Sequence, residues 1–184
     1  MKNIVLYLIM MSALFATSCT NSTNAPSSNA LLDNLTFDSS GHGSLNGWSY
    51  GASDMDSAAQ FTSDVPPGSS AKWSLLLSPG WIPRTEFVHH EFTGLSSGIY
   101  KLSLWEKVTQ KEGMGAVRIL TSNPAPMHIS ASMIAEDTVW TKISLLDTLT
   151  LSAKDTVSLE LTGGSTEVAA WHVLYNNITF EKLP

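Results

Sequence analysis

The stretch that decides the fold is Ile99-Tyr100-Lys101-Leu102-Ser103-Leu104-Trp105-Glu106-Lys107. Its large apolar side chains recur at every second position, at Tyr100, Leu102 and Leu104. The positions between them carry Lys101, Ser103, Trp105 and Lys107. Because successive side chains of a β-strand point to opposite faces, this period of two predicts a strand with one buried face and one face toward solvent.

The same alternation recurs near the C-terminus. In Thr156–Thr162, one face carries Val157, Leu159 and Leu161, and the other carries Ser158, Glu160 and Thr162. In the last segment, a regular alternation predicts that Leu174, Ile178 and Phe180 share a face with Asn176. Strands that are apolar on one side only must pack against a second sheet.

The rest of the chain consists of short apolar runs that turn residues separate, and no helical pattern stands out. Only 14% of the residues are charged. We expect strands at Leu31–Asp38, Trp48–Tyr50, Ser57–Thr62, Ala71–Leu77, Arg84–Phe92, Ile99–Thr109, Gly115–Thr121, His128–Ile134, Val139–Leu146, Thr156–Leu161 and Trp171–Glu181. Many short strands at this spacing predict an all-β fold, a single antiparallel β-sandwich.

The order of the motifs resembles that of a known family. The relevant segments are Leu31–Asp38, Gly47-Trp48, Gly94–Trp105, Val139-Trp140 and Tyr175–Phe180. In this order they resemble the galactose-binding-domain-like β-sandwiches, a fold used by many carbohydrate-binding modules. The resemblance covers most of the chain after its first 30 residues. It implies a jelly-roll topology and a carbohydrate ligand, although a fold by itself does not select the ligand.

The resemblance also bears on metal binding. Members of this family often hold a structural calcium ion between the first and last strands, with carboxylates and backbone carbonyls as ligands. Here Asp38 stands in place of the usual glutamate, and Asn176-Asn177 stand in place of an aspartate pair. Because Ca²⁺ depends on charged oxygen ligands for its affinity, we predict no cofactor for this chain.

The first 19 residues have the features of a targeting signal. Lys2 precedes an apolar block from Ile4 to Phe15, and Ala16-Thr17-Ser18 lead to Cys19, the only cysteine. This arrangement resembles the lipobox of bacterial lipoproteins, although that family prefers leucine where Ala16 stands. We therefore expect a lipoprotein signal peptide at 1–18, a flexible tether at 19–30 and the carbohydrate-binding-module-like β-sandwich at 31–184. The alternative is an ordinary secretory peptide followed by a stray cysteine.

This targeting signal predicts where the protein is located. With its lipid on Cys19, the protein would be a membrane-anchored bacterial lipoprotein, facing the periplasm or the cell surface. The net charge is −6 and no basic block occurs, which argues against nucleic acid as a partner. A single cysteine excludes disulfides within the chain and cysteine-based zinc sites.

Six tryptophans suggest how a ligand could bind, because a flat aromatic ring can stack on the apolar face of a sugar. Trp48 and Trp140 are interpreted as structural, following the resemblance, and Trp73 as a packing residue. The candidate ligand-binding residues are Trp81, Arg84, Trp105, Trp171 and His172. All but Trp105 lie in or beside loops, where recognition residues commonly occur.

Trp105 lies in a predicted strand. If Arg84–Phe92 pairs beside Ile99–Thr109, then Trp105 shares a solvent-facing surface with His89 and Glu91, and the three form a platform for a sugar. The alternative is that a loop covers this face of the sandwich.

The sequence therefore predicts a lipid-anchored, non-catalytic protein of the bacterial envelope that binds carbohydrate or a related polar ligand. It contains no Gly-x-Ser-x-Gly elbow, phosphate-binding glycine loop or dinucleotide fingerprint. One alternative is a structural or protein-interaction module of an envelope complex. Another is a small glycan hydrolase that uses a pair of its acidic residues.

Replacing Cys19 with serine tests the anchor. The thiol is the acceptor for the lipid, so we expect the Cys19→Ser variant to lose palmitate labelling and to move to the soluble fraction. Metabolic labelling and membrane fractionation measure both effects. A variant that stays labelled and membrane-bound would contradict the lipoprotein assignment.

Overall fold

A computed structural model describes residues 30–50, 59–78, 85–109, 114–122, 127–166, 169–170 and 172–184. Cys19 and the predicted signal peptide and tether lie outside these residues, apart from Ala30. Within them the chain forms strands and no helix. The strands are β1 (Ala30–Leu35), β2 (Asp38–Ser39), β3 (His42–Gly43), β4 (Ser49–Tyr50), β5 (Ala59–Thr62), β6 (Ser74–Leu77), β7 (Thr85–Thr93), β8 (Gly98–Val108), β9 (Met114–Ser122), β10 (Met127–Ala135), β11 (Thr141–Leu149), β12 (Thr156–Thr166), β13 (Ala169–Ala170) and β14 (Val173–Lys182).

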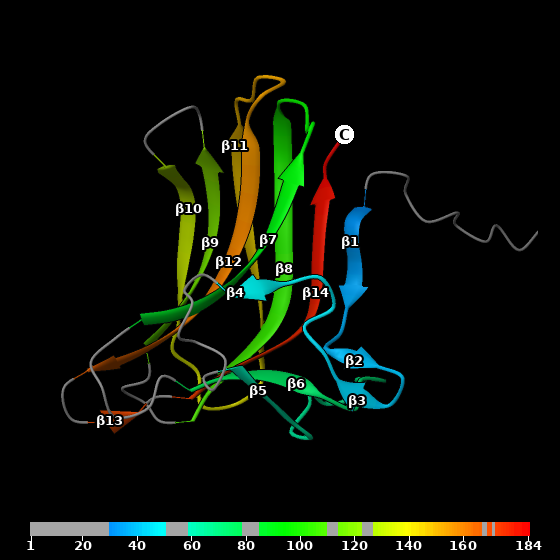
Figure 1. The fold of residues 1–184 in the computed structure, drawn as a ribbon, viewed down its shortest axis with the longest axis vertical. Coiled ribbons are helices and arrows are strands. Elements are labelled where there is room, and N and C mark those ends of the chain that lie inside the picture. The colour runs from blue at the N-terminus through cyan, green and yellow to red at the C-terminus, as the bar shows by residue number, and fades with distance from the viewer. Residues whose placement is uncertain are drawn as a thin grey trace, which may run out of the picture.

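These strands form two main sheets packed face to face (Figure 1). Sheet I has the order β11-β8-β14-β6-β5, and β1 also pairs with β14. Sheet II has the order β10-β9-β12-β7-β4, and β13 pairs with β12. All pairings are antiparallel. The all-β, jelly-roll sandwich predicted from the sequence is confirmed. The described residues include no helix long and apolar enough to span a membrane.

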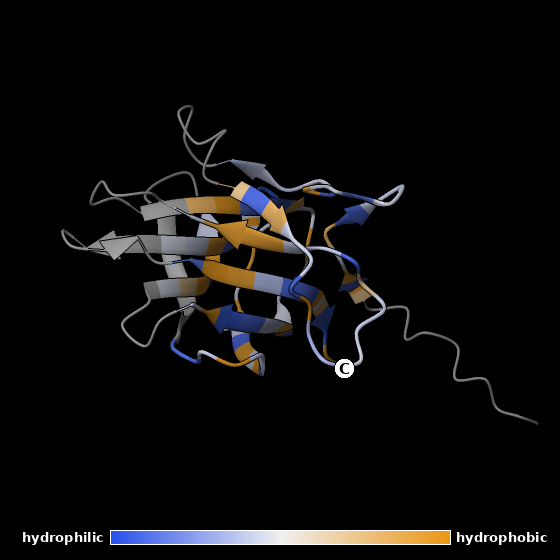
Figure 2. Ribbon diagram, turned by 90° about the horizontal axis from the view of Figure 1, so that it is seen from below, coloured by the Kyte–Doolittle hydropathy of each residue, from blue (hydrophilic) through white to orange (hydrophobic). Residues whose placement is uncertain are grey.

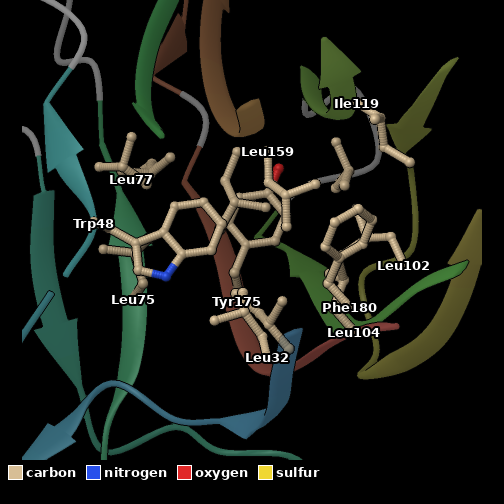
Figure 3. Close-up of a cluster of buried hydrophobic side chains, with 14 of the residues drawn as sticks. Leu32, Trp48, Leu75, Leu77, Leu102, Leu104, Ile119, Leu159, Tyr175 and Phe180 are labelled. Atoms are coloured by element: carbon tan, nitrogen blue, oxygen red, sulfur yellow. The ribbon is translucent and has the colours of Figure 1, made fainter. Parts of the chain in front are cut away.

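The core lies between the two sheets. Figure 3 shows Leu102, Leu104, Tyr175 and Phe180 of sheet I packed with Ile119 and Leu159 of sheet II. The Phe180 ring lies 5.4 Å from the Tyr100 ring in its own sheet and 5.3 Å from the Phe92 ring of the opposite sheet. Figure 2 shows the apolar residues concentrated along the strands in the middle of the molecule. With no disulfide available, burial of these side chains supplies the main stabilisation.

The close approach of the sheets requires a small residue at one point. A side chain carbon added at Gly115 of β9 would lie 2.8 Å from the Tyr175 hydroxyl of β14. That hydroxyl donates to the backbone carbonyl of Thr162 on β12, at 2.8 Å. The absence of a side chain at Gly115 therefore allows a polar link between the sheets inside the core.

The predicted alternation is confirmed in β8 and β12. Tyr100, Leu102 and Leu104 are buried in the core. In β14 the prediction is wrong. The register between β14 and β8 shifts between Asn176 and Thr179, and Asn177 has a φ of 50°. This bulge leaves Leu174 on the outer face, opposite Lys107, whereas Ile178 and Phe180 point into the core. An extra residue in one strand reverses the faces beyond it.

A tight turn ties the N-terminal strands to sheet II. Asn46 and Gly47 have φ values of 49° and 88°, which suit an Asn-Gly pair. The Asn46 side chain amide donates to the backbone carbonyls of Thr36 and Asp38. The Gly47 carbonyl lies 3.1 Å from Nδ1 of His90, which packs on Trp48. Burial lowers the pKa of His90, which favours its neutral form, and the ring packs between Trp48 and Phe92.

Glu106 is the exception in the buried face of β8. Its side chain is 2% exposed, and Oε2 has no partner among the described residues. Burial, followed by the charge of Asp137, raises the pKa of Glu106 to about 7, although a hydrogen bond from the Glu136 backbone N–H opposes the shift. Beside it, the Val108 backbone N–H donates to the Asp137 carbonyl at 2.7 Å. The carboxyl therefore faces the β10–β11 connection, which joins sheet II to sheet I.

The raised pKa of the Glu106 carboxyl predicts that the stability of the fold depends on pH. Its folded pKa of about 7 lies above the unfolded value of 4.5, so folded Glu106 holds a proton that the unfolded chain releases. The free energy of unfolding should fall as pH rises from 4.5 to 7, by up to about 3 kcal/mol from this group alone. The Glu106→Gln variant should lose this slope and be more stable than the wild type at pH 8.

Urea unfolding between pH 4.5 and pH 8 measures this slope. Asp33→Asn is the matched control, because Asp33 is exposed on β1 and is not among the groups that shift the pKa of Glu106. An unchanged slope in Glu106→Gln would contradict the assignment of the proton to Glu106.

Candidate functional site

The outer face of sheet I is crossed by the segment that joins β5 to β6. Asp64 follows β5 at one edge of the sheet, yet its carboxylate accepts from Lys107 Nζ of β8 at 2.5 Å and from Trp140 Nε1 at 2.8 Å. Burial alone would raise the pKa of Asp64, but the two donors outweigh it and lower that pKa. The segment also reaches β14, where the Ser69 hydroxyl bonds the Asn177 amide.

This crossing segment leaves part of the outer face of sheet I closed to ligands. Leu174 and Asn176 point outward from β14, yet they are 3% and 0% exposed. Trp140, which was interpreted as structural, is held by Asp64. A loop over this face is the alternative that the sequence analysis left open for Trp105.

The predicted platform of Trp105, His89 and Glu91 does not exist. Trp105 is half-buried on the outer face of sheet I, opposite Lys142 and Asn176 on its neighbouring strands. β7, which carries His89 and Glu91, lies in sheet II between β12 and β4. The turn at 94–98 does not close a hairpin but carries the chain from one sheet to the other. The pairing of β7 beside β8 was wrong, and Trp105 and His89 face opposite sides of the molecule.

The outer face of sheet II, in contrast, holds an open groove with a volume of about 200 Å³. Val88, Ile119 and Leu159 point into the core, so their neighbours along each strand point outward. The groove is lined by Phe87, His89 and Glu91 of β7, by Thr156, Ser158 and Glu160 of β12, and by Leu120 and Ser122 of β9. It extends over three adjacent strands and, from Phe87 to Glu91, about 13 Å along the sheet.

A polar row crosses this groove. Arg118, Glu160 and His89 are direct partners across β9, β12 and β7. Arg118 Nη1 donates to Glu160 Oε1 at 2.6 Å, and Glu160 is 6% exposed. A short, largely buried ion pair of this kind is held more firmly than an exposed pair. It fixes the Glu160 carboxylate on the floor of the groove.

His89 lines the groove and carries a polar atom without a partner. Its Nδ1 is buried and has no hydrogen-bond partner among the described residues. An unpaired buried nitrogen is costly. The Phe87 ring lies 6.2 Å from the His89 ring, and Leu120 adds a second apolar surface. Apolar and polar groups therefore converge in one depression.

The remaining predicted ligand residues are not brought together. Trp81, Arg84 and Trp171 lie outside the described residues, as does Cys19. His172 is half-buried beside β14, where its carbonyl accepts from the Thr109 N–H at 2.9 Å, and it does not line the groove. The alternation in the sequence places Phe87 on the same strand face as His89 and Glu91, and Ser158 with Glu160 on a face of another strand. It does not single out Arg118 or Leu120, because no local signal shows that three separate strands are neighbours.

The calcium site implied by the resemblance does not fit the residues present. The Asn176 amide donates to the Trp73 carbonyl and the Ser74 hydroxyl, at 3.0 and 2.7 Å. Its oxygen accepts from the Asn177 N–H. Of the residues that the resemblance implies as ligands, Asp38 alone carries a carboxylate, and this carboxylate accepts from the Lys72 N–H. No group of three potential metal-ligating side chains occurs within the described parts of the chain. Hydrogen bonds between amides, hydroxyls and carbonyls join β14 to β6 and to the segment before β6.

No family model matches this chain, and no curated protein matches it. Solved structures do share its fold. TmCBM61, solved with β-1,4-galactotriose, is 14% identical, and the match covers 85% of this chain and 100% of that one, with a TM-score of 0.52. The CBM22-1 xylan-binding domain of Xyn10C from Paenibacillus barcinonensis is 15% identical, with 84% and 94% covered and a TM-score of 0.56.

A third similar structure is an enzyme. An arabinose-bound GH51 α-L-arabinofuranosidase is 17% identical, with a TM-score of 0.55, but the match covers only 26% of that chain. The fold is therefore that of the carbohydrate-binding-module sandwiches, and it occurs both alone and as part of larger enzymes.

Because the residues present do not fit a calcium ion, we predict that the stability of the fold does not depend on calcium. Adding CaCl₂ or EDTA should leave the Tm unchanged, because a ligand shifts stability only if the folded state binds it. The Asn46→Ala variant should instead lose about 1–3 kcal/mol, since two half-buried carbonyls lose their donor. Calorimetry measures both. A Tm that falls in EDTA and recovers with Ca²⁺ would contradict the conclusion that the residues do not fit Ca²⁺.

Proposed function

We propose that this protein is a non-catalytic carbohydrate-binding module and that its ligand lies in the groove on the outer face of sheet II. The observation that carries the proposal is the convergence of an aromatic ring, a fixed carboxylate and an imidazole ring in one open depression. The similar structures support it, because two of them are carbohydrate-binding modules by description.

The chemistry of the groove suits a sugar. A pyranose ring has an apolar face, formed by its C–H groups, and a rim of hydroxyls. Phe87 and Leu120 offer apolar surface for the face, and Glu160, His89 and Ser158 offer acceptors and donors for the hydroxyls. A groove that runs about 13 Å along β7 extends beyond a single ring, so the proposed ligand is a segment of an oligosaccharide.

The location remains part of the proposal. Acylation of Cys19 would hold the sandwich near a bacterial membrane, on a short polar tether. A sugar-binding module in that place would capture glycans for partner proteins of the envelope. The alternative roles, as a protein-interaction module or a small hydrolase, are outcomes of the binding assay.

Phe87 and Trp105 provide a matched test, because they lie on opposite faces of the sandwich. The Phe87→Ala variant should bind the best ligand about tenfold more weakly, through loss of stacking. The Trp105→Ala variant should bind it as the wild type does. Affinity electrophoresis on galactan, xylan, mannan and mixed β-glucan, followed by calorimetry, measures the change. Far-UV circular dichroism and the Tm show that both variants are folded.

The outcomes separate the candidates. Weaker binding in Trp105→Ala alone would place the ligand on sheet I and overturn the proposed site. Release of reducing ends from a bound glycan would overturn the non-catalytic role. No binding to any polysaccharide by the folded wild type would overturn carbohydrate recognition itself.

A further inference from the structure

We propose that the groove selects uncharged glycans over glycans that carry carboxylates or sulfates, and that Glu91 and Glu160 set this selectivity. The inference rests on the proposed function, because it concerns the ligand class of the same groove. It depends on the distribution of charge over the outer face of sheet II.

The first element is the ion pair. Arg118 could in principle bind an anionic sugar, since a guanidinium pairs well with carboxylate and sulfate. In this structure its Nη1 is committed to Glu160 at 2.6 Å, and Glu160 is 6% exposed. The pair has no net charge. An incoming carboxylate would have to compete with Glu160 for the guanidinium.

The second element is Glu91. It lines the groove two residues beyond His89, it is exposed, and no cation lies within ion-pairing distance of it in the described part of the chain. Its carboxylate is a hydrogen-bond acceptor only, which suits a sugar hydroxyl. The same carboxylate repels an anionic substituent in the groove.

The third element is the composition of the strands. Arg118 is the only lysine or arginine in β4, β7, β9, β10 and β12, the strands along which sheet II is ordered. The whole chain has a net charge of −6. The face therefore offers no second cation from these strands to compensate for Glu91, and a uronic acid at this point would meet net repulsion at neutral pH.

Glu160 adds a reciprocal expectation. If Glu160 is replaced by glutamine, the side chain keeps its size and a hydrogen-bonding oxygen, but the charge of Arg118 is no longer matched. The freed guanidinium would attract an anionic sugar. Removing the charge of Glu91 would also relax the selectivity, but by less, because no cation is uncovered. The two substitutions should therefore change the preference in the same direction with unequal size.

The experiment compares polymers that share a backbone and differ in charge. The pairs are hydroxyethylcellulose with carboxymethylcellulose, and unsubstituted xylan with glucuronoxylan. Binding is measured at pH 8, where histidine is neutral, and at low and high salt. The wild type should prefer the neutral member of the pair that it binds by about tenfold or more at low salt, and by less at high salt.

The variants test the residues. Glu160→Gln should reduce or reverse the preference, and Glu91→Gln should reduce it. The preference is the ratio of the two affinities of each variant, so a loss of affinity that is common to both polymers leaves it unchanged. Asp33→Asn is the matched control, since it removes one charge from an exposed position on β1 in sheet I. It should leave the preference as in the wild type, which separates a local effect from the net charge of the protein.

Each outcome is decisive. Equal binding of neutral and acidic polymers by the wild type overturns the selectivity but leaves carbohydrate binding intact. A preference that Asp33→Asn changes as much as Glu91→Gln and Glu160→Gln overturns the role of the two residues. Failure of the folded wild type to bind any of these polymers or any polysaccharide of the first assay overturns the proposed function, and this inference with it.

Discussion

The packing of Phe180 between the two sheets is the contact on which the rest of the structure depends. Its ring touches Tyr100 within sheet I and Phe92 across the core. Phe180 reaches this position only because the bulge at Asn176-Asn177 shifts the register of β14. β14 is central in sheet I, where it pairs with β1, β6 and β8. This single bulge therefore determines which side chains of β14 enter the core, and with them the alignment of the strands that carry the two outer faces.

The outer faces of the two sheets differ from each other. The segment after β5 crosses sheet I and is held by Asp64 at its far side, so that Leu174 and Asn176 are buried without belonging to the core. On sheet II the corresponding outward positions form an open groove with a polar row across it. A sandwich needs only its inner faces for stability, and so the open outer face is free to take on recognition.

The family resemblance served the fold better than the site. Its strand order led to the correct architecture, and its calcium ligands did not carry over. The amides of Asn176 and Asn177 bond the Trp73 carbonyl and Ser69, and Asn46 satisfies the carbonyls of Thr36 and Asp38. Neutral side chains that donate as well as accept can close such a junction through hydrogen bonds, which acceptor-only carboxylates cannot do without a cation.

The class of fold, the approximate limits of the strands, and the apolar residues of β8 and β12 that enter the core could be predicted from the sequence. These follow from a period of two, which is a local property of the chain. Only the tertiary structure decided that β7 lies beside β12, that Arg118 reaches Glu160, and that Trp105 is separated from His89. Antiparallel strands that are far apart in sequence can pair in many orders with similar local patterns, and the order is chosen by how the two apolar faces fit together. The polar face of each strand could therefore be predicted from the sequence, but the groove formed by three such faces could not.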